Sequence, residues 1–280
     1  MTRREAVQFA EKQLLQAGIA EARLDARYLF CYVTGLSQTQ LMLDGEELLS
    51  EDMCRHYEEL VEKRAEHIPL QHLTGEQEFM GMSFEVTPDV LVPRQDTECL
   101  VEEVLKYSEG KRVLDLCTGS GCIAVSIAKL GKPQVVHASD LSKAALAVAE
   151  RNAGKLRAEI RFFEGDLYEA ISEKYDIIVS NPPYIATAEL AGLMQEVRLH
   201  EPVMALDGAE DGLLFYRRII EAAHDYLMPD GMLFFEIGCN QAGAVSTLLL
   251  QNGFESVQVR KDYAGLDRVV SARWVKAIPL

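Results

Sequence analysis

The chain of 280 residues lacks several features that would assign it to a special structural class. It has no run of about 18 uninterrupted apolar residues, so we expect no membrane-spanning helix and no membrane partner. Its first residues are mixed and polar, without the apolar stretch of a signal peptide, which predicts a cytoplasmic protein. Internal repeats and low-complexity tracts are also absent, which excludes solenoid and fibrous architectures.

Cysteine is scarce and scattered. None of the six cysteines forms a Cys-x-x-Cys pair, and no histidine lies at the spacing of a zinc site. We therefore predict no metal, and we expect buried, reduced thiols at all six positions: Cys31, Cys54, Cys99, Cys117, Cys122 and Cys239.

Positive charge is also in short supply, with 28 Lys and Arg against 44 Asp and Glu, a net charge of −16. Residues 1–92 hold 8 basic and 17 acidic side chains, a net of −9, and the remaining residues carry −7. Such a balance argues against tight binding to a phosphate backbone, so we expect no direct nucleic-acid partner.

The hydrophobic pattern divides the chain into three parts. Residues 1–72 show only helical spacing, with Thr2 and Ser50 as expected helix caps, and predict a small helical bundle. Residues 73–92 include a short two-strand pattern around Gly81, which predicts a β-hairpin linker. Residues 93–280 form the third predicted part, which opens with a helix that we expect Thr97 to cap.

From residue 111 onward, strand and helix patterns alternate, which is typical of a parallel sheet covered by helices on both faces. Between the last long helix and the fifth strand, Pro229-Asp230-Gly231 predicts a turn. The fold class is therefore α/β, with strands expected over residues 113–116, 135–139, 160–163, 176–180, 232–237, 255–260 and 268–274.

The stretch Asn181-Pro182-Pro183-Tyr184 directly follows the fourth apolar strand. Each proline fixes φ near −65° and has no N–H, so neither continues a central strand. Asn181 precedes a proline and is held extended. The strand therefore ends in a stiff corner that presents a carboxamide, proline carbonyls and an aromatic ring.

Three other strand ends carry groups suited to a nucleoside. A glycine loop follows the first strand, Asp140 ends the second strand, and Asp166-Leu167 follows the third. The loop glycines allow close approach to backbone N–H groups, Asp140 suits ribose hydroxyls, and Asp166 with Leu167 suits adenine. The predicted cofactor-binding residues are Cys117, Thr118, Gly119, Ser120, Gly121, Asp140, Asp166, Leu167 and Asn181.

Two cofactors fit such a site, NAD and S-adenosyl-L-methionine. The loop lacks the third glycine of the dinucleotide fingerprint, and no later segment suggests a nicotinamide half-site. Adenosylmethionine has no pyrophosphate, so a shorter loop is sufficient. Together with the Asn-Pro-Pro-Tyr corner, this favours S-adenosyl-L-methionine.

With these motifs in place, the whole chain resembles the release-factor glutamine methyltransferases (PrmC/HemK family). The resemblance rests on the corner and on further segments at residues 92–98, 115–121, 201–206, 235–238 and 262–269. Two departures are Cys117, where glycine is usual, and Gln95-Asp96 in place of Pro-Glu.

That resemblance implies a class I (Rossmann-like) seven-stranded methyltransferase domain over residues 93–280, preceded by a helical bundle and a hairpin linker. We expect the bundle, residues 1–72, to recognise the substrate. The resemblance also implies methylation of the side-chain amide nitrogen (N5) of the glutamine in the Gly-Gly-Gln motif of bacterial class 1 peptide chain release factors. We expect a monomeric cytoplasmic enzyme.

The chemistry agrees with this resemblance, because an amide nitrogen is a poor nucleophile and has to be held in place. The Asn181 side-chain oxygen and the Pro182 carbonyl are two acceptors for its N–H groups, and Tyr184 packs on the amide and faces the cationic methyl. Asn181, Pro182 and Tyr184 are the predicted catalytic residues, and with Pro183 they form the predicted substrate site.

Three residues have open roles. Glu236 either acts directly or ties down the corner, and Arg94 either binds the cofactor carboxylate or pairs with Asp96 or Glu98. His200 is expected to be a surface histidine in a loop.

Three other functions remain as alternatives. A DNA adenine-N6 methyltransferase uses a similar tetrapeptide on a flipped base, but it needs a basic groove that this acidic chain lacks. A ribosomal-protein glutamine N5-methyltransferase shares the corner but typically has a Pro-Arg-Ser-Pro segment. A non-enzymatic nucleoside-binding module would use the corner only structurally.

Overall fold

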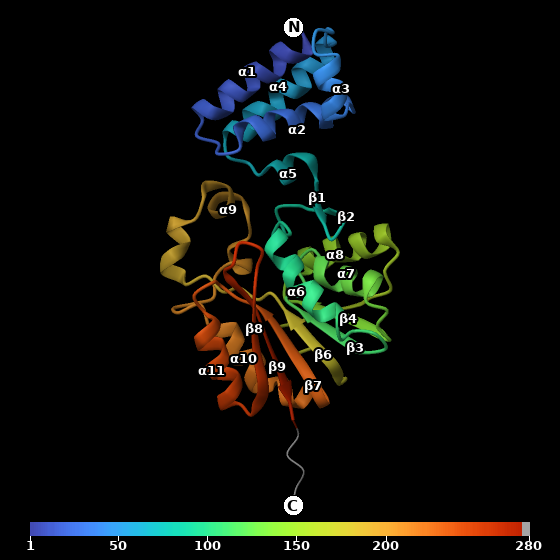
Figure 1. Cartoon of the computed structure of the whole chain (residues 1–280), viewed down its shortest axis with the longest axis vertical. Coiled ribbons are helices and arrows are strands. Elements are labelled where there is room, and N and C mark those ends of the chain that lie inside the picture. Colours follow the sequence, from blue (N-terminus) through green and yellow to red (C-terminus); the bar gives the residue numbers. More distant parts are fainter. Residues whose placement is uncertain (276–280) are drawn as a thin grey trace, which may run out of the picture. The chain divides into compact units, whose positions relative to one another are not determined.

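The computed structural model describes residues 1–275, which divide into two compact units. The helical unit contains residues 1–76, whose helices α1 to α5 are labelled in Figure 1, and also residues 194–200. The sheet unit contains residues 77–193 and the described chain from residue 201 onward. The predicted hairpin therefore groups with the sheet unit, and a short segment from late in the chain groups with the helices.

Five consecutive helices build the helical unit, as the spacing of residues 1–72 predicts. They are α1 (Arg3–Gln16), α2 (Ala22–Thr34), α3 (Gln38–Leu43), α4 (Glu51–Ala65) and α5 (Leu70–Thr74). The predicted caps are confirmed, since the Thr2 hydroxyl accepts from Glu5 N and the Ser50 hydroxyl accepts from Met53 N.

The core of this unit lies between α1, α2 and α4. Phe30 and Tyr57 pack edge to face with ring centroids 5.6 Å apart, and the Tyr57 hydroxyl donates to Ala26 O at 2.8 Å. Buried Arg64 pairs with buried Asp25 at 2.7 Å. Arg64 also reaches Glu196 at 3.0 Å in the short helix α9 (Gln195–His200), which explains why this late segment groups with the helical unit.

The sheet unit contains a seven-stranded sheet of order β5-β4-β3-β6-β7-β9-β8, which confirms the predicted α/β class. The first five strands in this order are parallel, and β9 runs antiparallel to both of its neighbours. The strands are β3 (Arg112–Leu116), β4 (Val135–Asp140), β5 (Arg161–Glu164), β6 (Tyr175–Ser180), β7 (Leu227–Glu236), β8 (Phe254–Lys261) and β9 (Asp267–Trp274).

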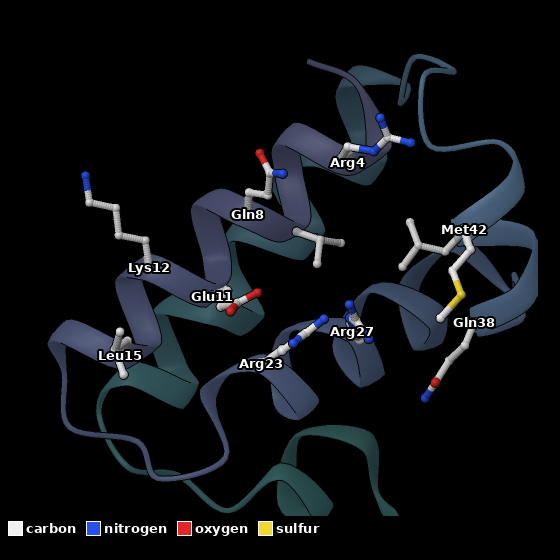
Figure 2. Close-up of a pocket in the computed structure, with 11 residues that line it drawn as sticks. Arg4, Gln8, Glu11, Lys12, Leu15, Arg23, Arg27, Gln38 and Met42 are labelled. Atoms are coloured by element: carbon white, nitrogen blue, oxygen red, sulfur yellow. The ribbon is translucent and has the colours of Figure 1, made fainter.

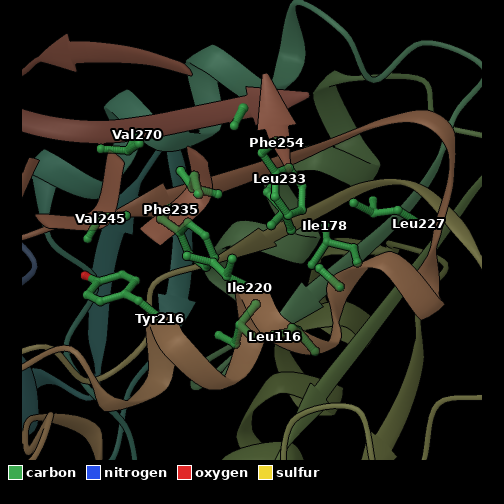
Figure 3. Packing of buried hydrophobic residues seen from close by; sticks show 14 of the residues in the cluster. Leu116, Ile178, Tyr216, Ile220, Leu227, Leu233, Phe235, Val245, Phe254 and Val270 are labelled. Carbon is green, nitrogen blue, oxygen red and sulfur yellow. The ribbon is translucent and has the colours of Figure 1, made fainter. Parts of the chain in front are cut away.

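Side chains alternate between the two faces of the sheet along each strand, and both faces are buried. Leu116, Ile178 and Phe235 point to the face covered by α10 (Leu214–Tyr226) and α11 (Ala242–Gln251), and Figure 3 shows this packing. Val113, Ile177 and Phe234 point to the opposite core, shared with α6 (Gln95–Leu105) and α7 (Cys122–Leu130), while α8 (Lys143–Leu156) lies against β4 and β5.

The hairpin of β1 (Glu76–Phe79) and β2 (Met82–Glu85) packs on the sheet unit. Phe79 and Phe84 are fully buried in the core that contains α6 and α7. The side chain of buried Asn152 in α8 makes two hydrogen bonds to the backbone of Glu85. Its Oδ1 accepts from Glu85 N at 2.7 Å and its Nδ2 donates to Glu85 O at 3.0 Å, so β2 is also bound to α8.

Several predictions about local structure are wrong. Thr97 does not cap α6, because that helix begins at Gln95 with Arg94 as its N-cap, and Thr97 is buried inside the first turn. Residues 229–231 form no turn between elements; β7 runs through them with a bulge, and Asp230 takes φ 63°. Only Cys99 and Cys122 are buried, whereas buried thiols were expected at all six positions; Cys239 is exposed and the other three are half-buried.

The segment between β6 and α10 contains elements that the sequence did not predict. These are two 3-10 turns, η1 (Thr187–Gly192) and η2 (Val203–Ala205), and helix α9. His200 therefore ends a helix instead of lying in a loop. Within residues 1–275, no helix is long and apolar enough to cross a membrane, and no group of three or more His, Cys, Asp or Glu is arranged to hold a metal ion.

Candidate active site

The register of the sheet aligns the predicted site residues. One row across four neighbouring strands consists of Ser139, Leu116, Ser180 and Phe235. The next row, at the carboxyl ends of the same strands, is therefore Asp140, Cys117, Asn181 and Glu236. Adjacent strands lie about 4.8 Å apart, so the glycine loop and the Asn-Pro-Pro-Tyr corner begin side by side.

A cavity of about 430 Å³ opens over this row, a size that suits a small cofactor. Most of the predicted cofactor residues line it, namely Cys117, Thr118, Gly119, Ser120, Asp140, Asp166, Leu167 and Asn181, together with Pro183 from the corner. Gly121, Pro182 and Tyr184 are not among the described residues that line it. The lining also includes Arg94, for which binding of the cofactor carboxylate was one of two alternatives, and Thr97, which was predicted only as a helix cap.

The loop after β3 is held in an unusual conformation. Cys117, Gly119 and Gly121 all have positive φ, at 59°, 54° and 79°. A side chain at Gly121 would place Cβ 3.0 Å from the Cβ of Ala149, so only glycine fits there. Cys117 stands where glycine is usual in the family. Its Cβ is therefore held at a positive φ that glycine would adopt without strain.

Asp115 supports the loop from below, a role that the sequence did not reveal. Its carboxylate is fully buried and accepts a hydrogen bond from the Thr118 hydroxyl at 2.6 Å. Burial raises the pKa of Asp115 to about 7. Its Oδ1 is buried without a partner among the described atoms, so this carboxyl can accept one more donor.

Asp140 is placed as the nucleoside interpretation requires. Its Oδ2 accepts from Gly119 N at 2.9 Å and its Oδ1 accepts from Ser142 N at 2.8 Å. Burial raises its pKa. The carboxylate therefore links the second strand to the glycine loop and lies at the cavity wall.

Asp166 and Leu167 also reach the cavity, from the turn after β5. Leu167 is buried and takes φ 54°, which turns the apolar side chain into the wall. Asp166 is more exposed and pairs with Arg218 at 2.8 Å. An adenine amino group would therefore share this carboxylate with Arg218.

The corner after β6 is clamped from outside by contacts that the sequence did not predict. The Gln241 side chain donates to Tyr184 O at 2.9 Å. A Cβ at Gly212 would lie 2.3 Å from Tyr184 O, and a Cβ at Gly208 would lie 2.9 Å from Pro183 O. These two glycines thus let the chain pack directly against the backbone of the corner.

Glu236 lies beneath the corner, almost completely buried at 2% exposure. Its Oε1 lies 3.4 Å from the Tyr184 hydroxyl. Burial raises the pKa of Glu236 to about 7, opposed by the Thr97 hydroxyl and by Arg268, and burial also raises the pKa of Tyr184. Asn181 Nδ2 lies 3.4 Å from the Thr97 hydroxyl, so four side chains form one group.

Arg94 pairs with neither Asp96 nor Glu98. Its guanidinium binds both oxygens of buried Glu201, at 2.6 and 2.8 Å, while its side chain also borders the cavity. Asp96 pairs instead with Arg268 at 3.2 Å, and Glu98 accepts from Met80 N. One guanidinium nitrogen of Arg94 thus donates to both Glu201 oxygens, and this charged contact fixes Arg94 at the cavity rim.

The residues present fit S-adenosyl-L-methionine. The glycine loop offers a concave backbone, Asp140 offers acceptors for ribose, and Leu167 with Ile123 offers apolar wall. The loop lacks the third glycine of the motif that binds the pyrophosphate of a dinucleotide, which agrees with a cofactor that has no pyrophosphate. Bound here, the cofactor would supply an electrophilic methyl group beside Asn181.

A second hollow, of about 650 Å³, lies within the helical unit between α1, α2 and α3 (Figure 2). Four basic side chains line it, Arg4, Lys12, Arg23 and Arg27, with Glu11 as the one acid in the lining. Leu15 and Met42 are exposed at its wall. The groove is thus basic and partly apolar, within a part of the chain that is acidic as a whole.

Comparison with known proteins assigns both units. Residues 5–75 match the family model of the PrmC N-terminal domain, and residues 95–266 match that of the methyltransferase small domain. A release factor glutamine methyltransferase of Geobacter sulfurreducens is 43% identical over 275 residues, which cover 97% of this chain and 96% of that protein. The Bacillus subtilis protein of the same name is 41% identical over 280 residues and 96% of both chains.

Solved structures support the fold of the sheet unit. A methyltransferase from Pyrococcus furiosus matches with a TM-score of 0.55 and 19% identity, covering 70% of this chain and 91% of that one. A T. thermophilus 16S rRNA methyltransferase in complex with AdoMet and guanosine matches with a TM-score of 0.52 and 18% identity, covering 71% and 49%. The described sheet is therefore that of a class I methyltransferase.

Proposed function

This chain belongs to the release factor glutamine methyltransferase family, and from that premise we propose that it methylates the glutamine of the Gly-Gly-Gln motif in bacterial class 1 peptide chain release factors. The methyl donor is S-adenosyl-L-methionine, and the accepting atom is the side-chain amide nitrogen, N5. The proposed place of action is the cytoplasm, where release factors work.

The observation that carries this proposal is the position of the corner. Asn181 stands in one row with Cys117 and Asp140, so the amide-binding group and the cofactor loop share one cavity. The Asn181 oxygen and the Pro182 carbonyl accept the two N–H groups of the glutamine amide and fix its plane. Holding the nitrogen in line with the methyl group supplies much of the acceleration as effective concentration.

The roles of the other residues follow from their places around the cavity. Cys117, Thr118, Gly119 and Ser120 form the concave loop, and Gly121 starts the helix behind it. Asp140 binds the ribose, while Asp166 and Leu167 bind the adenine. Pro183 and Tyr184 complete the substrate side of the corner.

The test is methyl transfer from labelled cofactor onto purified release factors, with the modified residue mapped by mass spectrometry. We expect a single labelled glutamine, in the Gly-Gly-Gln motif. Label on a ribosomal protein or on adenine in DNA, with none on the release factors, would replace this function with one of the two enzymatic alternatives. Cofactor binding without transfer to any of these substrates would favour a nucleoside-binding module.

For the partner, we propose that the helical unit recognises the body of the release factor. A tripeptide is too small to specify one protein, so the enzyme has to read other surface. Exposed acids gather in this unit at Asp44, Glu46, Glu47, Glu51 and Asp52, and they complement the basic surface expected of an RNA-associated partner. The groove of Figure 2 has the opposite charge and suits an acidic segment.

This recognition is tested by charge reversal in the full chain. We expect Asp44→Lys with Glu51→Lys to raise KM for the intact release factor about tenfold, and to leave methylation of a short Gly-Gly-Gln peptide unchanged. The control is Glu109→Lys with Glu255→Lys, which makes the same charge change at exposed sites of the sheet unit. Equal effects of the two pairs would contradict recognition by the acidic residues.

A further inference from the structure

The proposed function requires one particular orientation of the Asn181 side chain. A carboxamide has an oxygen end that only accepts hydrogen bonds and an NH₂ end that only donates them, and the two ends have nearly the same shape. Only the oxygen end can accept the N–H of a glutamine amide. The protein therefore needs a device that keeps the NH₂ end away from the substrate.

The neighbour on the NH₂ side is Thr97. The distance from Asn181 Nδ2 to the Thr97 hydroxyl oxygen is 3.4 Å, and Thr97 is 2% exposed in the first turn of α6. A hydroxyl both donates and accepts, so Thr97 alone would tolerate either end of the carboxamide. The choice depends on where the Thr97 proton goes.

Glu236 settles the direction of that proton when its carboxyl is ionised. An ionised carboxylate only accepts, and Glu236 has more acceptor capacity than it uses. Its Oε1 lies 3.4 Å from the Tyr184 hydroxyl, and its buried Oε2 makes no hydrogen bond to the described atoms, so this oxygen is free to accept the Thr97 proton. The Thr97 hydroxyl is close enough to favour the charged form of this carboxylate.

We propose that Thr97 and Glu236 are positioning residues for methyl transfer: the Glu236 carboxylate draws the Thr97 proton, Thr97 then accepts from Asn181 Nδ2, and Asn181 Oδ1 faces the substrate. This inference rests on the proposed function, because it explains how that reaction keeps its acceptor aimed. In this proposal the Asn181–Thr97 contact is the one seen at 3.4 Å, and the Thr97–Glu236 bond forms when Glu236 is ionised. Neither Thr97 nor Glu236 needs to touch the reacting atoms.

The orientation depends on pH, because a protonated Glu236 donates as well as accepts and no longer fixes the Thr97 proton. Burial places the pKa of Glu236 at about 7, within the range of an assay. Its charge is stabilised by Arg268 and disfavoured by Asp96. The ionisable groups that face it come from five different helices, strands and loops: Arg268, Asp96, Tyr184, Cys122 and Tyr216.

Kinetics of three variants test the chain of bonds. Thr97→Val keeps the shape but removes the hydroxyl, and we expect kcat to fall about tenfold with KM and cofactor affinity within twofold of wild type. Thr97→Ser restores the hydroxyl and should recover most of kcat. Wild-type kcat should rise with pH through about 7, and Glu236→Gln should flatten that rise. An unchanged kcat in Thr97→Val, or an unchanged pH profile in Glu236→Gln, overturns the inference.

A second measurement does not depend on activity. The chain contains only four asparagines, so the side-chain amide of Asn181 can be followed by NMR in protein labelled with ¹⁵N-asparagine. In wild type we expect this resonance to shift with a midpoint near pH 7, and in Thr97→Val and Glu236→Gln we expect no such shift. If the Asn181 side-chain amide resonance of the wild-type protein does not shift with pH, the inference is overturned.

The two measurements also separate this inference from the proposed function. The expected amide titration in a protein that methylates no release factor would refute the function and leave the positioning chain intact. Methylation of the Gly-Gly-Gln glutamine, with kcat, pH profile and amide resonance all unaffected by the variants, would do the reverse.

Discussion

Glu236→Gln should change how the stability of the sheet unit depends on pH. The glutamine keeps the shape of the side chain but removes its ionisation. In the folded protein, burial raises the pKa of Glu236 from 4.5 to about 7. A raised pKa means that the folded state holds the proton more tightly than the unfolded state, so the stability from this group is full below about pH 4.5 and is lost as pH rises through 7.

The magnitude follows from the same two values. Each pKa unit corresponds to ~1.4 kcal/mol, so ionisation of Glu236 costs the folded state about 3 kcal/mol, and most of this cost falls between pH 5 and pH 8. No discount for solvent screening applies, because the side chain is 2% exposed. Relative to wild type, the variant should therefore gain about 2 to 3 kcal/mol of stability between pH 5 and pH 8.

The assay is urea unfolding at several pH values, followed by fluorescence. The chain has one tryptophan, Trp274 in β9, so the signal reports the sheet unit. Glu255→Gln is the control, since Glu255 is exposed on β8 and should show no pH-dependent difference from wild type. If the difference in unfolding free energy between wild type and Glu236→Gln stays constant from pH 5 to pH 8, the assignment of a raised pKa to Glu236 is refuted.

Three further predictions concern the site. Asn181→Ala should lower kcat at least ~10²-fold, as for the loss of one preorganised transition-state hydrogen bond, with cofactor affinity retained; near-normal turnover rules out its role. Asp140→Ala should weaken the binding of adenosylmethionine by about 10- to 100-fold in calorimetry, because hydrogen bonds to a charged group are worth ~1.5–3 kcal/mol; an unchanged affinity removes Asp140 from the site. Gly212→Ala should lower both thermal stability and kcat, because its Cβ would lie 2.3 Å from Tyr184 O at φ +72°; retention of both would show that the corner can move.

Local patterns predicted most of the elements. Caps such as Thr2 and Ser50 act within one turn of helix, and alternation along each strand is enforced by two buried faces, so both can be read from short windows. The ends of β4 and β6 put Asp140 and Asn181 where the sequence predicted, because parallel strands share a carboxyl edge. The prediction of a turn at Pro229-Asp230-Gly231 was wrong because these residues lie within β7, which pairs with β6 and β9 and forms a bulge there.

Contacts between distant segments were beyond the reach of local patterns. Thr97 has the composition of a cap, but its helix starts earlier and its hydroxyl meets Asn181, 84 positions away. Arg94 finds Glu201 across 107 positions instead of the acids next to it. Gly208 and Gly212 appear in the sequence as ordinary loop glycines, and only the packed backbone of Pro183 and Tyr184 shows why a side chain would not fit.

The membership of α9 in the helical unit has a consequence for exchanging parts between relatives. The chain passes from one unit to the other after residues 76, 193 and 200, so the helical unit is encoded in two separate stretches. Arg64 and His67 in the first stretch both contact Glu196 in the second. A chimera that takes residues 1–76 from another protein, but keeps the native 194–200, would join surfaces that had not been selected together. Functional hybrids should therefore require both stretches from the same parent.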